Sequence, residues 1–382
     1  MFKKGIYILI SIFFNTVKFI KIRILKWGYG DTFSGYLLEK IPYDFLKDFF
    51  NLIPAKYIFI TGTNGKTSTT ALTVHILSNL GFTVYSNKTG SNLYRGILSF
   101  FALNFIKFIN KSPKYIVLEL DEGSVSKILQ NFPKNKHFSF ILLNISRDQL
   151  DRYGEIDILL KNIYSSLTKF TKKTLILNTN DKNISNFKSL KSDLPLSKCP
   201  KDLVNLLGIS EQPHLIENLS FILTLLNNEK ISVLPHKLSK FSFVPGRGSI
   251  YVLNNTFFEV HLTKNPKSFN NNLSILLKNK KIKNVLILVN DYIPDGRDVS
   301  WFFDIDEILL IKALKDKNIF VGGSRSYDFC NMLMLYKLPC INLYKYNNYK
   351  YLSFIFNISN FFVLSNYSAT QQVLKYLKNE SV

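Results

Sequence analysis

Short apolar runs alternate with stretches of helical periodicity along most of this chain. Five runs in the first half have the length and the β-branched or aromatic content of buried strands, at residues 57–61, 82–86, 115–120, 138–144 and 174–178. Between them, residues 66–80 and 149–169 have the apolar spacing of helices. This order predicts an α/β domain with a largely parallel sheet and helices on both faces.

The alternation of apolar runs and helical stretches is interrupted and then resumes in the second half of the chain. A polar, weakly patterned stretch covers residues 179–213, and a helix is predicted at residues 215–226. Pro245-Gly-Arg-Gly248 has the composition of a hinge. After it, apolar runs typical of strands return at residues 249–253, 257–262, 284–290, 318–323 and 361–365. The chain therefore divides into an N-terminal segment (1–50), a first α/β domain (51–244) and a second, smaller one (245–382).

The N-terminal segment is apolar and basic. Its run from Gly5 to Ile20 is interrupted by Asn15 and Lys18 and is shorter than the ~20 residues of a spanning helix. No small-residue cleavage site follows it, so a secretory signal is not expected. Two alternatives remain: an amphipathic helix that lies on a membrane surface, and a helix that packs on the first domain.

Composition narrows the class of protein further. The formal net charge of +22 is compatible with a polyanion-binding surface, but the lysines are spread evenly, which favours compositional drift instead. The three cysteines lie far apart, as expected in a reducing cytoplasm, and they cannot form a four-cysteine zinc site. We therefore expect a cytoplasmic protein without zinc.

The strongest chemical motif, Thr61-Gly-Thr-Asn-Gly-Lys-Thr67, joins a predicted strand to a predicted helix. Glycines in such a loop let backbone N–H groups converge on phosphate oxygens at the start of a helix. Lys66 would reach the β- and γ-phosphates, and the Thr67 hydroxyl would coordinate Mg²⁺. Ile60 stands where the general pattern of this loop has its first glycine. The motif predicts a nucleotide site made by Gly62, Thr63, Asn64, Gly65, Lys66, Thr67 and Ser68.

This shortened loop resembles that of the Mur ligase superfamily, whose members join amines to carboxylates through acyl phosphates. Three later segments are similar to its MurT-like branch. Asn144–Glu155 contains R-D-Q-L-D-R-Y-G-E, Leu262–Pro266 reads L-T-K-N-P, and Asn290–Trp301 contains D-G-R-D-V-S-W. The resemblance implies a P-loop ATPase domain of the Mur ligase type with a parallel sheet, then a smaller Rossmann-like domain, with ATP in the cleft between them.

The resemblance also implies a reaction. MurT-like proteins are the ATP-using subunits of lipid II isoglutaminyl synthase, which acts in peptidoglycan biosynthesis. Such a subunit would phosphorylate the α-carboxylate of D-glutamate in the lipid II stem peptide, with ATP and Mg²⁺ as cofactors. Ammonia from a GatD-like glutaminase subunit would then displace the phosphate and give D-isoglutamine. The implied location is peripheral, on the inner face of the cell membrane.

Several residues outside the loop are candidates for the same site. Glu119 ends a predicted strand and is expected to hold Mg²⁺ together with Thr67, because ligands collect at the carboxyl ends of parallel strands. Asp121 and Glu122 are further candidates for metal or substrate contact. The resemblance implies nucleotide or metal contacts for Asn144 and Asp148, and a phosphate-facing loop at residues 87–92.

In the second domain, the resemblance implies that Arg247 closes on the ATP phosphates. Asp295, Arg297 and Asp298 fall where Mur ligases contact the nucleotide from their C-terminal domain. One aspartate of this segment is also expected to complete the glutaminase triad of the partner, with Asp298 favoured and Asp295 next. The alternative is that these residues simply build a turn around Asp-Gly.

Two features depart from the family pattern. Gly248 and Ser249 follow Arg247 where the family usually has an aromatic residue and a glutamate, and residues 181–214 lack the zinc ribbon common in MurT-like proteins. Two other functions therefore stay open. One is another Mur-type ligase, similar to folylpolyglutamate or cyanophycin synthetase. The other is an ATP-dependent nucleic-acid-binding protein, which the even lysine distribution disfavours, so no nucleic-acid partner is expected.

Overall fold

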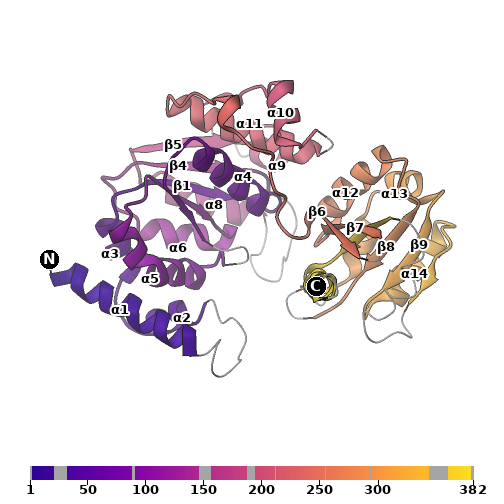
Figure 1. The fold of residues 1–382 in the computed structure, drawn as a ribbon, viewed down its shortest axis with the longest axis horizontal. Coiled ribbons are helices and arrows are strands. Elements are labelled where there is room, and N and C mark those ends of the chain that lie inside the picture. The colour runs from indigo at the N-terminus through magenta and orange to yellow at the C-terminus, as the bar shows by residue number, and fades with distance from the viewer. Residues whose placement is uncertain are drawn as a thin grey trace. The chain divides into compact units, whose positions relative to one another are not determined.

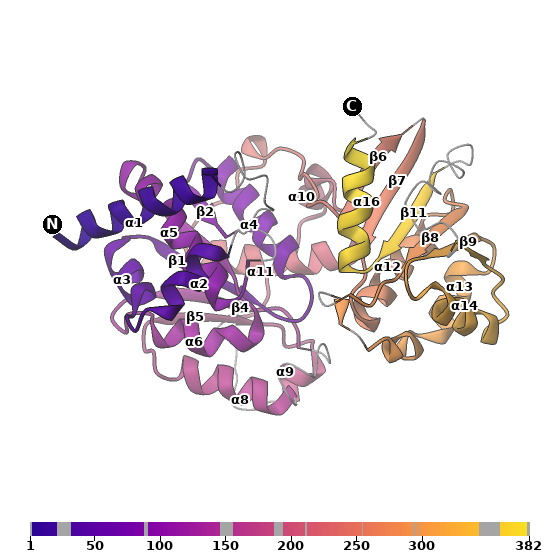
Figure 2. The same ribbon diagram turned by 90° about the horizontal axis from the view of Figure 1, so that it is seen from below.

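The computed structural model of the chain divides into two compact units, Met1–Phe241 and Ser242–Val382 (Figures 1 and 2). The division lies three residues before the start of the Pro245–Gly248 segment expected to be a hinge. The structure describes residues 2–20, 32–87, 91–145, 156–186, 194–210, 212–253, 255–292, 295–296, 298–343 and 360–379.

Unit 1 is built around a parallel five-stranded sheet with the strand order β2-β3-β1-β4-β5. Its strands are β1 (Lys56–Thr61), β2 (Val84–Ser86), β3 (Tyr115–Glu119), β4 (Phe138–Leu142) and β5 (Lys173–Leu177). The central strands are buried on both faces, which explains their nearly continuous apolar runs. The predicted parallel sheet is confirmed.

Helices cover both faces of this sheet (Figure 1). The helices of unit 1 are α1 (Phe2–Phe19), α2 (Phe33–Lys40), α3 (Phe45–Leu52), α4 (Lys66–Asn79), α5 (Tyr94–Asn110), α6 (Val125–Gln130), α8 (Ile156–Leu167), α9 (Lys182–Asn186), α10 (Lys201–Leu207) and α11 (Pro213–Asn228). Helices α4 and α11 pack together on one face. The other face is covered by α1, α2, α3, α5, α6 and α8, which share one hydrophobic core with it.

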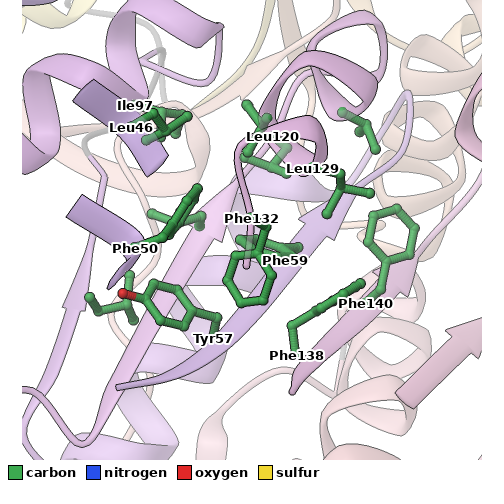
Figure 3. Close-up of a cluster of buried hydrophobic side chains, with 14 of the residues drawn as sticks. Leu46, Phe50, Tyr57, Phe59, Ile97, Leu120, Leu129, Phe132, Phe138 and Phe140 are labelled. Carbon is green, nitrogen blue, oxygen red and sulfur yellow. The ribbon is translucent and has the colours of Figure 1, made fainter. Parts of the chain in front are cut away.

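That core is rich in aromatic rings (Figure 3). Phe132, which follows α6, lies 5.0 Å from Phe50 of α3, 5.4 Å from Phe59 of β1 and 5.3 Å from Phe138 of β4, measured between ring centroids. All three pairs are edge-on, the arrangement that the ring quadrupole favours. The cluster fixes β1 and β4 in the sheet and so positions the loops that follow them.

Unit 2 has a six-stranded sheet in the order β10-β9-β8-β11-β7-β6. Its strands are β6 (Arg247–Leu253), β7 (Thr256–Leu262), β8 (Asn284–Leu288), β9 (Asn318–Gly322), β10 (Ile341–Asn342) and β11 (Phe361–Ser365). Its helices are α12 (Pro266–Lys278), α13 (Glu307–Leu314), α14 (Ser326–Leu335) and α16 (Tyr367–Asn379). The core on one face includes α12, α13 and α14, and the core on the other face includes α16.

The second sheet is mixed rather than purely parallel, because β6 pairs antiparallel with β7. The pairing continues to Leu253 opposite Thr256, so the two strands form a tight hairpin. Asn255, with φ of 63°, adopts the left-handed conformation that such turns require. The α/β fold class is confirmed, with this antiparallel edge strand as its one departure among the described strands.

Two segments near the ends of unit 1 add detail to the sequence predictions. The polar stretch at 179–213 contains the short helices α9 and α10. The N-terminal segment forms α1, which packs on α3 and α5 through its buried side. Among the helices that the structure describes, none is both long and apolar enough to cross a membrane.

Candidate functional site

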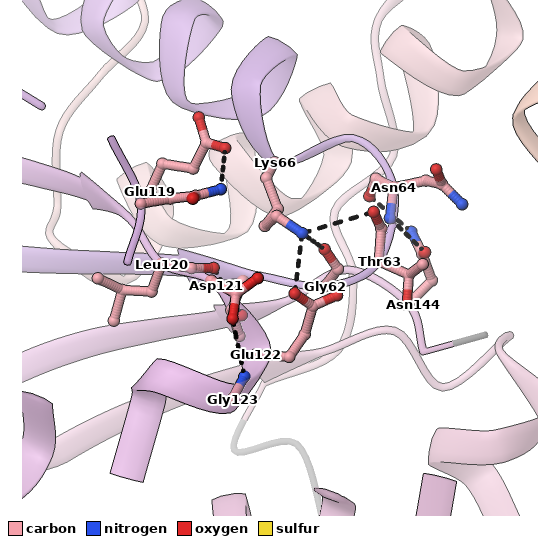
Figure 4. Close-up of polar contacts among 12 residues, drawn as sticks. Gly62, Thr63, Asn64, Lys66, Glu119, Leu120, Asp121, Glu122, Gly123 and Asn144 are labelled. Atoms are coloured by element: carbon pink, nitrogen blue, oxygen red, sulfur yellow. Dashed lines mark hydrogen bonds and ion pairs between the residues drawn. The ribbon is translucent and has the colours of Figure 1, made fainter. Parts of the chain in front are cut away.

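Three loops meet at the carboxyl edge of the sheet in unit 1 (Figure 4). Strand β1 lies between β3 and β4, and its Ile60 is paired with Glu119 on one side and with Ile141 on the other. The loops that leave these strands therefore start side by side. In parallel α/β sheets this edge is where ligands bind.

The loop after β1 has the backbone of an anion-binding loop. Gly62 and Gly65 have φ values of 135° and 89°, which L side chains rarely adopt. Helix α4 begins at Lys66 without a side-chain cap, and its first intrahelical bond runs from the Thr69 N–H to the Gly65 carbonyl at 2.9 Å. The N–H groups of residues 66–68 therefore have no acceptor within the helix. Such groups favour a bound phosphate.

Lys66 is held inside this loop by an acidic partner. Its Nζ donates to the Gly62 carbonyl at 2.5 Å and lies 2.9 Å from Glu122 Oε2, and the residue is only 7% exposed. Burial alone would lower the pKa of Lys66, but the charge and hydrogen bond of Glu122 outweigh it and raise the pKa above its ordinary value. Lys66 therefore stays an ammonium ion, and a phosphate that enters the loop would compete with Glu122 for it.

Asn144, at the end of β4, braces the loop from the other side. Its Oδ1 accepts from the Asn64 N–H at 3.0 Å, and its Nδ2 donates to the Asn64 carbonyl at 2.9 Å. Its own carbonyl accepts from the Thr63 N–H at 2.8 Å. Both ends of the Asn144 amide thus contact the backbone of Asn64, so this residue positions the loop.

We expect Gly62→Ala to disable this loop. A Cβ at position 62 would lie 2.9 Å from both the backbone nitrogen and oxygen of Asn144, and the φ of Gly62 is itself unfavourable for alanine. Gly81→Ala is the matched control, since φ is +92° there but nothing lies within 4 Å of the added atom. Isothermal titration of ATP should show at least a ~100-fold weaker Kd for Gly62→Ala and little change for the control. Equal affinities would contradict the bracing role of Asn144.

Glu119 is fixed by two asparagines that flank the second loop. Asn87 accepts from the Glu119 N–H at 2.9 Å and donates to its carbonyl at 3.0 Å. Asn92 Nδ2 donates to Glu119 Oε1 at 3.0 Å. The expected second loop therefore lies beside Glu119 at its two described ends, where Asn87 holds the backbone of Glu119 and Asn92 holds its carboxylate.

The residues present fit a Mg²⁺ ion that is bound mainly through phosphates. Thr67 lies half-buried in the first turn of α4, and Glu119 is 4% exposed at the end of the neighbouring strand. Mg²⁺ is usually held by one or two protein oxygens together with phosphates and water. In the described part of the chain, no group of three or more His, Cys, Asp or Glu side chains could hold a metal ion. These two residues match that mode of binding, in which most ligands do not come from the protein.

Sequence reasoning missed Asn218 of α11. Its side chain is 3.3 Å from the position that a Cβ of Gly65 would take and is 5% exposed, and its buried Nδ2 has no hydrogen-bond partner among the described residues. A buried, unpaired amide is costly, so it fits a site where a ligand supplies the acceptor. The signal was present in the sequence, because Asn218 interrupts the apolar side of the helix that Leu215 and Leu219 define.

In unit 2, the two candidate aspartates have different surroundings. Asp295 accepts from the N–H of Ser368 at 2.7 Å and from the Ser368 hydroxyl, and burial raises its pKa despite these bonds. Asp298 is exposed and accepts from the N–H of Ser300 at 2.8 Å, and hydrogen bonds from the Ser300 side chain and backbone lower its pKa. Asp295 therefore helps to hold the start of α16, whereas Asp298 presents an ionised carboxylate to the surface.

Other residues of this segment form a network that the sequence did not predict. Asn290 donates to the Ser368 hydroxyl at 3.0 Å and accepts from the Ser324 N–H at 3.0 Å. Asp291 pairs with Arg325 at 2.9 Å, and hydrogen bonding from Ser324 together with the Arg325 charge lowers the pKa of Asp291. Asn290, Asp291 and Asp295 therefore tie the segment after β8 to the starts of α14 and α16.

The other candidate site residues lie in β6, in the loop before α4 or the first turn of α4, or outside the described residues. Arg247 is half-buried at the start of β6, opposite His261 of β7. Thr63, Asn64 and Ser68 lie in the loop and the first turn of α4, as the motif predicted. Asp148, Arg297 and residues 88–90 lie outside the described residues.

Two family models match separate parts of this chain. The Mur ligase middle domain matches residues 60–199, and the MurT ligase C-terminal domain matches residues 262–370. The first match contains the loop at residues 61–67, and the second contains the segment with Asp295 and Asp298.

Individual proteins agree with these models. The chain is 25% identical to the MurT subunit of lipid II isoglutaminyl synthase (glutamine-hydrolyzing) from Staphylococcus aureus (strain COL), over 91% of this chain and 93% of that protein. It is 37% identical to the corresponding subunit from Streptococcus pneumoniae (strain ATCC BAA-255 / R6), over 40% of this chain and 33% of that protein. Its fold matches that of the MurF ligase from Thermotoga maritima in complex with ADP, with a TM-score of 0.64 and 13% identity, over 91% and 84% of the two chains.

Proposed function

The chain belongs to the Mur ligase family, in its MurT branch, and on that premise we propose that it amidates the D-glutamate α-carboxylate of the lipid II stem peptide at the expense of ATP. The observation that carries the proposal is the similarity to the MurT subunit from S. aureus, which extends over both units. The loop geometry supports it, because Lys66, Gly62 and Gly65 provide the charge and the backbone shape that ATP phosphates require.

The proposed chemistry needs a leaving group, because a carboxylate is a poor electrophile. A carboxylate oxygen attacks the γ-phosphorus of ATP and releases ADP, which leaves an acyl phosphate. Ammonia then attacks the carbonyl carbon, phosphate departs with the bonding electrons, and the nitrogen loses a proton to give the amide. Both steps require groups that neutralise charge and hold the reactants in line.

We assign the residues of unit 1 to those tasks. Lys66 neutralises the phosphates after leaving Glu122, while Asn144 keeps the loop backbone in shape. Thr67 and Glu119 would hold Mg²⁺, which would supply positive charge to offset that of the phosphates. Asn218 would contact the nucleotide, and its Nδ2 would donate a hydrogen bond to it.

In unit 2, Arg247 and Arg297 are proposed to contact the nucleotide, and Asp298 to serve a partner subunit. That partner is a GatD-like glutaminase that delivers ammonia, and the two chains would form a heterodimer. Since lipid II is anchored in a membrane, the enzyme would work in the cytoplasm at the inner face of the cell membrane.

The test is reconstitution of the pair. The purified chain is mixed with a GatD-like glutaminase, ATP, Mg²⁺, glutamine and lipid II, and D-isoglutamine is measured by mass spectrometry alongside phosphate release. We expect amidation that requires every component and stops when EDTA removes Mg²⁺. ATP hydrolysis that responds to folate or to a peptide substrate, but not to lipid II, would assign the chain to another Mur-type ligase.

A further inference from the structure

Helix α1 carries an apolar stripe on the side that faces away from the domain. Leu9 is 66% exposed, Phe13 57% and Ile6 41%, and their spacing of three and four residues places them on one face of the helix. Ile12 (48%) and Phe19 (60%) extend the same exposed surface. Figures 1 and 2 show α1 at the outside of unit 1.

The opposite stripe anchors the helix and fixes its rotation. Tyr7 and Phe14 are buried in the core, and the Tyr7 hydroxyl donates to Asp48 Oδ2 at 3.0 Å. Asn15 Nδ2 donates to the carbonyl of Leu103 in α5 at 2.9 Å. Because these polar contacts all lie on the domain side, the outer stripe cannot turn inward without breaking them.

This arrangement reverses the usual pattern of a surface helix. A helix on a soluble domain normally places its apolar side against the core and its charged side in water. In α1, Thr16 is the one polar residue within the outward stripe, and the helix contains no acidic residue. Five large apolar side chains in contact with water indicate that another apolar phase covers them.

The charge of the N-terminal segment indicates what covers the apolar stripe of α1. Residues 1–30 contain six lysines and arginines and no aspartate or glutamate, within a chain of net charge +22. Anionic lipid headgroups attract a basic segment next to an amphipathic helix. A second copy of the chain would instead bring two like-charged segments together.

We propose that α1 lies in the plane of an anionic membrane surface, with Leu9 and Phe13 inserted among the lipids and unit 1 on the aqueous side. The inference stands on α1 alone and does not depend on the proposed reaction, although a lipid-linked substrate would be reached more readily from this position.

The experiment measures vesicle binding by the full-length chain without ATP, partner or lipid II. Flotation with phosphatidylcholine vesicles that contain 30% phosphatidylglycerol is compared with flotation with phosphatidylcholine alone, at low and high salt. The variant Leu9→Ser/Phe13→Ser removes two exposed side chains of the stripe. Met334→Ser/Leu335→Ser in α14 is the matched control, since those side chains are 62% and 71% exposed in the other unit.

We expect the wild-type chain and the control to float with anionic vesicles, and the α1 variant to bind at least ~100-fold more weakly. Binding should weaken at high salt and without phosphatidylglycerol. Absent flotation of the wild-type chain, or equal loss in the control, would overturn the proposal. So would a dimer in sedimentation velocity that only the α1 variant dissociates, because a second copy would then cover the stripe. Amidation of detergent-solubilised lipid II by the α1 variant tests the reaction separately.

Discussion

Replacing Lys66 with methionine is expected to reduce ATP-dependent amidation by at least ~1000-fold, because the ammonium that neutralises the transferred phosphoryl group is lost. Methionine preserves most of the side-chain volume, so the loop backbone should keep its shape. The measurement is initial phosphate release in the presence of the partner, glutamine and lipid II. Lys66→Met that retained most of the wild-type rate would sink the assignment of this loop to phosphoryl transfer.

The same substitution should also destabilise the folded chain, which complicates a simple reading of lost activity. Glu122 is 8% exposed and faces Lys66 at 2.9 Å, so the single variant removes the cation from beside a buried carboxylate. Breaking a buried pair in this way costs about 3 kcal/mol, or a Tm lower by roughly 6–12 °C for a unit of this size.

A double variant separates the two effects. Lys66→Met/Glu122→Gln also removes the negative charge of Glu122, so its Tm should return close to that of the wild type. Its activity should remain as low as that of Lys66→Met, because the missing ammonium is not replaced. Recovery of activity together with stability would mean that Lys66 only holds the fold.

The sequence predicted the elements that carry this site, since β1, the glycine loop and α4 are consecutive and each has a local signal. Lys66 and Thr67 could be assigned from the loop motif alone. Glu119 could be placed at the same edge because strand ends converge in a parallel sheet. These predictions depend on local pattern and on one topological rule.

The contacts within the site could not be predicted in the same way. The pairing of Lys66 with Glu122 joins residues 56 positions apart, and the role of Asn144 depends on the close approach of β4 to the loop. Asn218 was visible only as a polar interruption of an apolar helix side. The sequence identifies which side chains are able to take part in chemistry. Packing decides which of them instead hold other site residues in position.

Asp298→Asn is expected to stop glutamine-dependent amidation while leaving ammonia-dependent amidation intact. The triad role requires an ionised, accessible carboxylate, and Asp298 has a lowered pKa and an exposed side chain. Asparagine still offers an oxygen to the Ser300 N–H, so the turn should persist. In a triad, the amide cannot orient and stabilise a protonated histidine as a carboxylate does, and losses of about 10⁴-fold are known for such changes.

Two aspartates serve as comparisons for that variant. Asp304→Asn changes an exposed carboxylate at the end of the 3₁₀ helix (Ser300–Asp304) that follows Asp298, and it should leave both activities near the wild-type level. Asp295→Asn removes an acceptor from the Ser368 hydroxyl, so it should lower Tm by a few degrees and reduce both activities together. The readout is D-isoglutamine formed with glutamine or with ammonium chloride as the nitrogen source. If Asp295→Asn selectively lost the glutamine reaction, the triad role would belong to Asp295 and not to Asp298. If Asp298→Asn lost both reactions in parallel, Asp298 would belong to the ligase chemistry itself.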